Sequence, residues 1–165
     1  MKMSAVEMDY PGSDRLEKAN VSADFMNSAY RQAGDQLTTA QTTIEMGSAE
    51  SVVDLAYAMK VDYERMINEI ESLDRIFKWN LADIDSGKQE SGIQQNFSSA
   101  GSQYDREFIQ KVLNGHKQLI SEFENQLQAG NLPVEIETWL ETNLVMFNRH
   151  YATCQKIRNG AEVLP

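Results

Sequence analysis

The sequence predicts an all-α protein, a four-helix bundle in which one long connection crosses between the second and third helices. Four long stretches show apolar residues at alternating steps of three and four, which is the pattern of amphipathic helices. A polar segment over residues 79–101 interrupts this pattern once. The chain has 165 residues, 41% of them hydrophobic, so it can form one ordinary globular domain with a sizeable core.

The first helix is expected over about residues 22–46, after a polar and flexible N-terminal tail over residues 1–21. Gly47 follows it in the position where glycine commonly ends a helix. Ser48 is a suitable N-cap for the next helix. The apolar or small residues of the first stretch form one seam: Met26, Tyr30, Ala33, Leu37, Ala40 and Ile44.

The second helix, over about residues 48–78, has the most regular pattern, and its outer positions, Asp62 among them, are charged. The third helix, over about 102–129, opens with a capping-box pattern from Ser102 to Asp105. The inward positions of the second helix are Val52, Ala56, Met59, Tyr63, Met66, Ile70, Leu73 and Phe77.

The fourth helix is expected over about residues 133–158, with Pro133 in its first turn and a short tail over 159–165. Short connections make the first pair and the second pair of helices antiparallel. The connection over 79–101 is long enough to run the length of the bundle. One long crossover is typical of ferritin-like bundles, and we therefore expect that topology.

Composition and charge exclude several classes of function. The chain carries 15 basic and 25 acidic side chains, a formal charge of −10, so it lacks the basic surface that nucleic acids or anionic lipids require. No apolar run approaches the ~20 residues of a transmembrane helix. The first residues lack the apolar core of a signal peptide, so we expect a cytoplasmic protein, or a periplasmic or cell-envelope protein if a leader has been removed.

A ferritin-like topology raises the question of a di-iron centre, which uses two Glu-x-x-His motifs. Here the residues three before the two histidines are Leu113 and Phe147, so this motif is absent. No cofactor and no catalytic residue are predicted. Cys154 lies one helical turn from His150, but a thiol in the middle of a packed helix is a poor nucleophile.

His116, His150 and Tyr63 all fall on the inward seams of their helices. Buried polar groups need hydrogen-bond partners, because an unpaired one costs about 1–3 kcal/mol. One interpretation is a polar cluster that binds a small ligand or a metal ion such as Zn, Cu, Ni or Fe. The other is that each side chain bonds a neighbour and packs as a core residue. If a metal is bound, the two histidines are its expected ligands.

The chain also resembles a bacterial family, domain of unknown function 4142, over about residues 22–158. That resemblance implies a ferritin-like helical bundle, and family members are often labelled outer membrane or periplasmic proteins. It implies no activity. The chain departs from the family pattern at Tyr63 and Tyr104, where histidine and phenylalanine are usual. The residues that carry the resemblance are Phe25, Val52, Ala56, Met59, Asp62, Tyr63, Tyr104, Asp105, Phe108, His116 and His150.

Three hypotheses of function follow from these patterns. The first is a non-enzymatic bundle that acts through its surface as a binding or stress-related accessory protein. The second is a bundle that binds a metal or a small ligand at His116, His150 and Tyr63, and it requires that these side chains converge. The third is a dedicated interaction or inhibitor module that uses the acidic face of the second helix. The sequence does not identify the partner or the oligomeric state.

Overall fold

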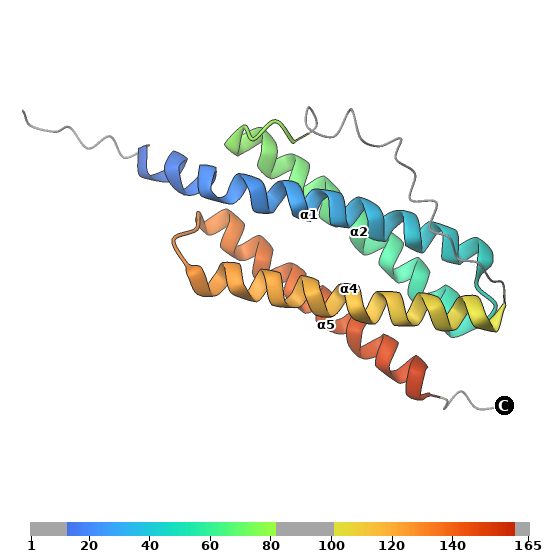
Figure 1. The fold of residues 1–165 in the computed structure, drawn as a ribbon. Helices are drawn as coiled ribbons and strands as arrows, with labels where there is room; N and C mark the ends of the chain where they lie inside the picture. The colour runs from blue at the N-terminus through green and yellow to red at the C-terminus, as the bar shows by residue number, and fades with distance from the viewer. Residues whose placement is uncertain (1–12, 82–100, 161–165) are drawn as a thin grey trace, which may run out of the picture.

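A computed structural model describes residues 13–81 and 101–160, and within these ranges every regular element is a helix. The helices are α1 (Ser13–Met46), α2 (Glu50–Phe77), α4 (Ser102–Ala129) and α5 (Val134–Asn159), and they form a four-helix bundle (Figure 1). α1 packs mainly on α2 and α4 mainly on α5, while the two pairs meet chiefly through α2 and α5. The predicted all-α four-helix bundle is confirmed.

The direction of the helices fixes the topology. Asp105, in the first turn of α4, contacts Ser48 just before α2, so α2 and α4 begin at the same end of the bundle. α2 runs from that end to the opposite end of the bundle, where it ends at Phe77 (Figure 1). The predicted crossover has to join the end of α2 to the start of α4, which lie at opposite ends of the bundle. Residues 82–100 of that crossover lie outside the described residues, and kinship with ferritins stays a prediction.

The first helix starts earlier than the sequence pattern indicated. α1 begins at Ser13 rather than near residue 22, so the predicted tail over 1–21 extends too far. The segment from Ser13 onward contains Arg, Leu, Glu, Lys and Ala, which favour helix. It lacks an apolar seam, so apolar periodicity does not indicate this part of the helix. At the other end, α5 continues to Asn159. Residues 1–12 and 161–165 lie outside the described residues.

The core follows the predicted seams most closely in α2, where all eight inward positions are buried. In α1 the seam is used differently. Ala33 and Ala40 are buried, whereas Tyr30, Leu37 and Ile44 are only partly buried against the core. Small residues at the contact allow two helices to approach closely. The larger α1 side chains accordingly cover the edge of the core.

Two of the predicted helix caps are wrong. The N-cap of α2 is Ala49, not Ser48, and α4 begins after Gly101 without a side-chain cap. The Asp105 carboxylate instead accepts hydrogen bonds from Ser48 N at 3.0 Å, Ala49 N at 2.9 Å and Ser48 Oγ at 2.6 Å. Asp105 of α4 thus caps the N-terminus of α2, because the free N–H groups of that helix end lie beside it.

The turn between α1 and α2 is tightly packed around Gly47, which supports a first prediction. A Cβ atom at Gly47 would lie 2.8 Å from Thr43 O and 3.0 Å from Val53 Cγ2. Gly47→Ala should therefore lower the free energy of unfolding by about 1–3 kcal/mol, measured by urea denaturation.

Gly34 provides the matched control for that substitution. It lies inside α1, and nothing is within 4 Å of an added Cβ. Gly34→Ala should raise stability by about 0.5–1 kcal/mol, because alanine is the better helix former. Equal stability of the two variants would contradict the packing described for the turn.

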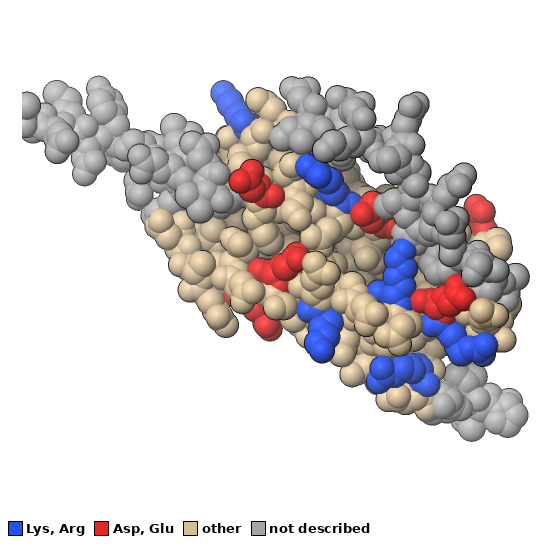
Figure 2. Space-filling view, viewed as in Figure 1, with Lys and Arg blue, Asp and Glu red and all other residues tan. Residues whose placement is uncertain are grey.

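None of the described helices is long and apolar enough to cross a membrane. On the face formed by α1 and α4, basic and acidic side chains are interspersed (Figure 2). Although acidic side chains outnumber basic ones in the chain, this face is not uniformly acidic.

Candidate functional site in the bundle core

The three polar residues of the predicted seams meet in the middle of the bundle. Tyr63 of α2, His116 of α4 and His150 of α5 are each at most 1% exposed. The Tyr63 hydroxyl lies 3.0 Å from His116 Nε2, and the same nitrogen lies 3.1 Å from His150 Nδ1. Phe147 stacks on Tyr63 and meets His116 edge-on, so aromatic rings hold the cluster in place.

The hydrogen bonds of His116 define its tautomer. His116 Nδ1 lies 3.0 Å from Val112 O, and since a carbonyl oxygen only accepts, Nδ1 must carry the hydrogen. Burial, reinforced by the neighbouring His150, lowers the pKa of His116 from 6.5 to about 3. The ring is therefore neutral near pH 7, and its Nε2 presents a lone pair to the cluster.

The same reasoning applies to His150. Its Nε2 lies 2.8 Å from Asp62 Oδ2, so this nitrogen donates to the carboxylate. Burial lowers the pKa of His150, and this effect outweighs the opposing influence of Asp62. In the neutral ring, Nδ1 is then the nitrogen without a hydrogen, and it points toward His116.

Two nitrogen lone pairs thus face each other across 3.1 Å. Neither can donate, and the Tyr63 hydroxyl has one hydrogen, which it donates to His116 Nε2. Two acceptors at hydrogen-bond distance repel each other unless a cation lies between or beside them. The cluster thus holds two ring nitrogens without hydrogens and one phenol oxygen close together.

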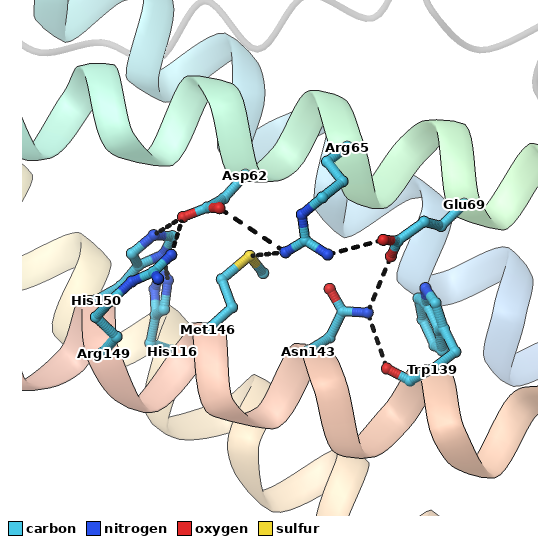
Figure 3. A network of polar contacts seen from close by, with 9 residues as sticks. All are labelled: Asp62, Arg65, Glu69, His116, Trp139, Asn143, Met146, Arg149 and His150. Atoms are coloured by element: carbon cyan, nitrogen blue, oxygen red, sulfur yellow. Dashed lines mark hydrogen bonds and ion pairs between the residues drawn. The ribbon is translucent and has the colours of Figure 1, made fainter.

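Asp62 links this cluster to the surface. Its side chain is 14% exposed and also pairs with Arg149 at 2.5 Å and, more loosely, with Arg65 at 3.8 Å. Arg65 in turn contacts Glu69 at 2.7 Å. Figure 3 shows these contacts continuing as a polar strip between α2 and α5, ending at Asn143. The interface between the two helical pairs is thus polar beside the site.

Sequence reasoning missed Asp62 as a member of the site. Asp62 was expected on the solvated face of its helix, because periodicity places it beside the seam and not on it. Its position directly before Tyr63 in the family pattern was the available signal. The acidic side chain reaches inward because His150 supplies a hydrogen-bond donor at the edge of the core.

Cys154 does not join the cluster as a ligand or a nucleophile. It is fully buried, and burial raises the pKa of its thiol to about 12, so it stays protonated near neutral pH. Among residues 13–81 and 101–160, no three His, Cys, Asp or Glu side chains are grouped so that they could hold a metal ion.

Fold and site together define an all-α bundle with a buried histidine–histidine–tyrosine cluster braced by a carboxylate. The chain belongs to the family described as Domain of unknown function (DUF4142), whose family model matches residues 11–157. This match confirms the resemblance carried by the residues of the seams. No curated protein and no solved structure matches the chain. The family description names no activity.

Proposed function

We propose that this protein is a non-enzymatic bundle that binds one divalent transition-metal ion in its core. The ligands are His116 Nε2, His150 Nδ1 and the Tyr63 phenolate oxygen. The observation that carries the proposal is the pair of nitrogen atoms without hydrogens, 3.1 Å apart and beside the Tyr63 oxygen.

The distance between these nitrogens suits a metal ion. A zinc–imidazole bond is about 2.0–2.1 Å long, and two such bonds to nitrogens 3.1 Å apart enclose an angle of about 100°. That angle is close to tetrahedral. It does not suit a linear two-imidazole complex, in which the nitrogens would be about 4 Å apart.

The outer nitrogens of both rings are held as metal-binding histidines usually are. A ligating histidine generally donates its other N–H to a backbone carbonyl or a carboxylate, which fixes the tautomer and orients the ring. His116 donates to Val112 O, and His150 donates to Asp62. Each ring therefore keeps the nitrogen without a hydrogen on the side of the cluster.

The charges also favour a divalent ion. Burial, together with Asp62 and Cys154, raises the pKa of Tyr63 well above 10, so without an ion the phenol is neutral. Binding must displace the phenol proton, and affinity should therefore rise with pH. One phenolate and the neighbouring Asp62 carboxylate, which also pairs with Arg149, partly offset the charge of a divalent ion and so limit the electrostatic penalty of burial.

The non-enzymatic part of the proposal is supported by access. All three ligand side chains are buried, so a substrate cannot reach them in this conformation. Zn, Cu, Ni and Fe are the ions that imidazole ligands suit. A surface role as an accessory protein is compatible with a metal that stabilises the bundle.

Thermal unfolding of tag-free protein tests the proposal. The chain has two histidines, so removing any polyhistidine tag leaves only the proposed ligands of that type. An ion present at a hundred times its Kd should add about 2.7 kcal/mol and raise the Tm by about 5–10 °C relative to protein in EDTA. Zn, Cu, Ni and Fe are compared in parallel.

Two variants make the result specific to the site. His116→Gln/His150→Gln should abolish the shift, and Tyr63→Phe, which keeps the ring in place, should reduce it. No shift with any of the four metals in the wild type would overturn the proposal. A Tm shift in both variants as large as that of the wild type would also overturn it.

A further inference from the structure

The dipeptide Asn-Gly occurs twice in the chain, as Asn114-Gly115 and as Asn159-Gly160. Asparagine followed by glycine is especially prone to deamidation, because glycine has no Cβ to hinder closure of a ring between the two residues. For that ring to close, the backbone nitrogen of the glycine has to reach Cγ of the asparagine. The two dipeptides share this chemistry but differ in their place in the fold, so the structure decides which of them reacts.

The first dipeptide is held inside a helix. Asn114 and Gly115 lie in the middle of α4, where each N–H bonds the carbonyl four residues earlier and the Gly115 nitrogen is fixed in that ladder. Asn114 Oδ1 accepts a hydrogen bond from Gln110 Nε2 at 3.0 Å. A Cβ atom at Gly115 would lie 3.1 Å from Gln36 Nε2, so α1 packs closely on this turn. The ring can close here only when α4 opens.

The second dipeptide lies at a helix end. Asn159 is exposed and is the last residue of α5, and Gly160 follows it with φ −86° and ψ 12°. Helix ends open far more readily than helix interiors. Arg158 Nε donates a hydrogen bond to Asn159 Oδ1 at 3.4 Å. A cationic donor on the amide oxygen draws electrons from Cγ and so favours attack on that carbon.

We infer that Asn159 is a site of spontaneous deamidation and that the fold protects Asn114. The Gly160 nitrogen attacks Asn159 Cγ, and the new C–N bond closes a five-membered succinimide ring. The C–N bond of the side-chain amide breaks, and ammonia leaves with the proton of the Gly160 N–H. Water then opens the ring at either carbonyl and produces an aspartyl or an isoaspartyl residue. Water is the one co-reactant.

The reaction changes the charge at the end of α5. A neutral amide becomes a carboxylate, and the helix dipole disfavours negative charge at a C-terminus. Lys156 and Arg158 lie in the same turn and offset part of this effect. The change is confined to the helix end, and the inference does not depend on metal binding in the core.

Peptide mapping by mass spectrometry tests the inference. The folded full chain is incubated at mildly alkaline pH in water labelled with heavy oxygen and is then digested in ordinary water. Only residues converted during the incubation carry the label, because opening of the ring takes up an oxygen atom from water. We expect Asn159 to convert at least about tenfold faster than Asn114, since Asn114 reacts only when α4 opens.

Unfolding the chain provides the control for sequence. In guanidinium chloride the helices are lost, and both dipeptides should convert at similar rates. A difference that disappears on unfolding is then a property of the fold. Equal rates at Asn114 and Asn159 in the folded protein would overturn the inference. It would also be overturned if Asn159 stayed intact in the folded protein while it converted in the denaturant.

Two glycine substitutions localise the reaction. Gly160→Ala places a methyl group beside the attacking nitrogen and should slow the conversion of Asn159 at least about tenfold. The φ of −86° at Gly160 is open to alanine, so the backbone is not strained. Gly34→Ala adds the same methyl group within α1 and should leave the rate at Asn159 unchanged. A Gly160→Ala variant that converts as fast as the wild type would contradict attack by this nitrogen.

Discussion

Replacing Asp105 with alanine should lower the free energy of unfolding by about 3 kcal/mol, because hydrogen bonds to a charged group contribute about 1.5–3 kcal/mol each and are not additive. The carboxylate accepts three hydrogen bonds from Ser48 and Ala49 and is only 7% exposed. Its loss leaves the N–H groups of Ser48 and Ala49, just before α2, without their acceptor. Urea denaturation monitored by circular dichroism measures the change.

Two controls separate the cap from a general loss of negative charge. Glu124→Ala removes an exposed acid from the same helix and should change stability by less than about 0.5 kcal/mol. Asp105→Asn keeps one acceptor oxygen and should cost less than the alanine substitution. If Asp105→Ala and Glu124→Ala are equally stable, Asp105 does not hold α4 to the start of α2.

The second large effect is a loss of stability in mild acid. In metal-free protein, His116 has a pKa of about 3 when folded and about 6.5 when unfolded. The unfolded state binds the proton more readily than the folded state. The contribution of neutral His116 to stability is therefore fully present above pH 6.5 and is lost as the pH falls toward 3. For His116 alone, the loss between pH 7 and pH 5 is about 2 kcal/mol.

The groups around the histidines set the size of this effect. The pKa of His150 is also lowered, by burial first, with Asp62 opposing and Arg149 and Arg65 adding to the decrease. Tyr63 faces the pair but stays protonated throughout this range. Its hydroxyl contributes no titration to the window.

Urea denaturation in EDTA at pH 7, 6 and 5 measures the effect, since carboxyl groups titrate mostly below this range. The chain has two histidines, so His116→Gln/His150→Gln should give a nearly flat profile. A wild-type profile that is equally flat would show that the rings are not buried in the neutral form. The same profile in Zn²⁺ should be steeper, because protons then compete with the ion.

Much of the fold could be predicted because apolar periodicity reflects burial directly. Every inward position assigned to α2, from Val52 to Phe77, is buried. The antiparallel pairs followed from short connections, and the long second connection predicted a crossover. The start of α1 was missed because its first turns have helix-forming composition but no apolar seam.

Local sequence rules failed where a side chain has a partner far along the chain. Ser102 to Asp105 has the spacing of a capping box, yet Asp105 caps α2 across the bundle. Asp62 has the position of a solvated charge, yet it bonds His150 on another helix. Tyr63, His116 and His150 could be placed on inward faces by periodicity. Their relative height along the bundle, and therefore their meeting, depends on packing that one sequence does not specify.

Metal content after equilibrium dialysis tests the core site most directly. Tag-free wild type and His116→Gln/His150→Gln are dialysed against Zn²⁺ at pH 7.5, passed through a desalting column and measured by elemental analysis. Metal binding at His116, His150 and Tyr63 predicts about one ion per wild-type chain and almost none in the variant. An equal metal content in the two proteins, or a wild type that retains no metal, would contradict a metal site in the bundle core.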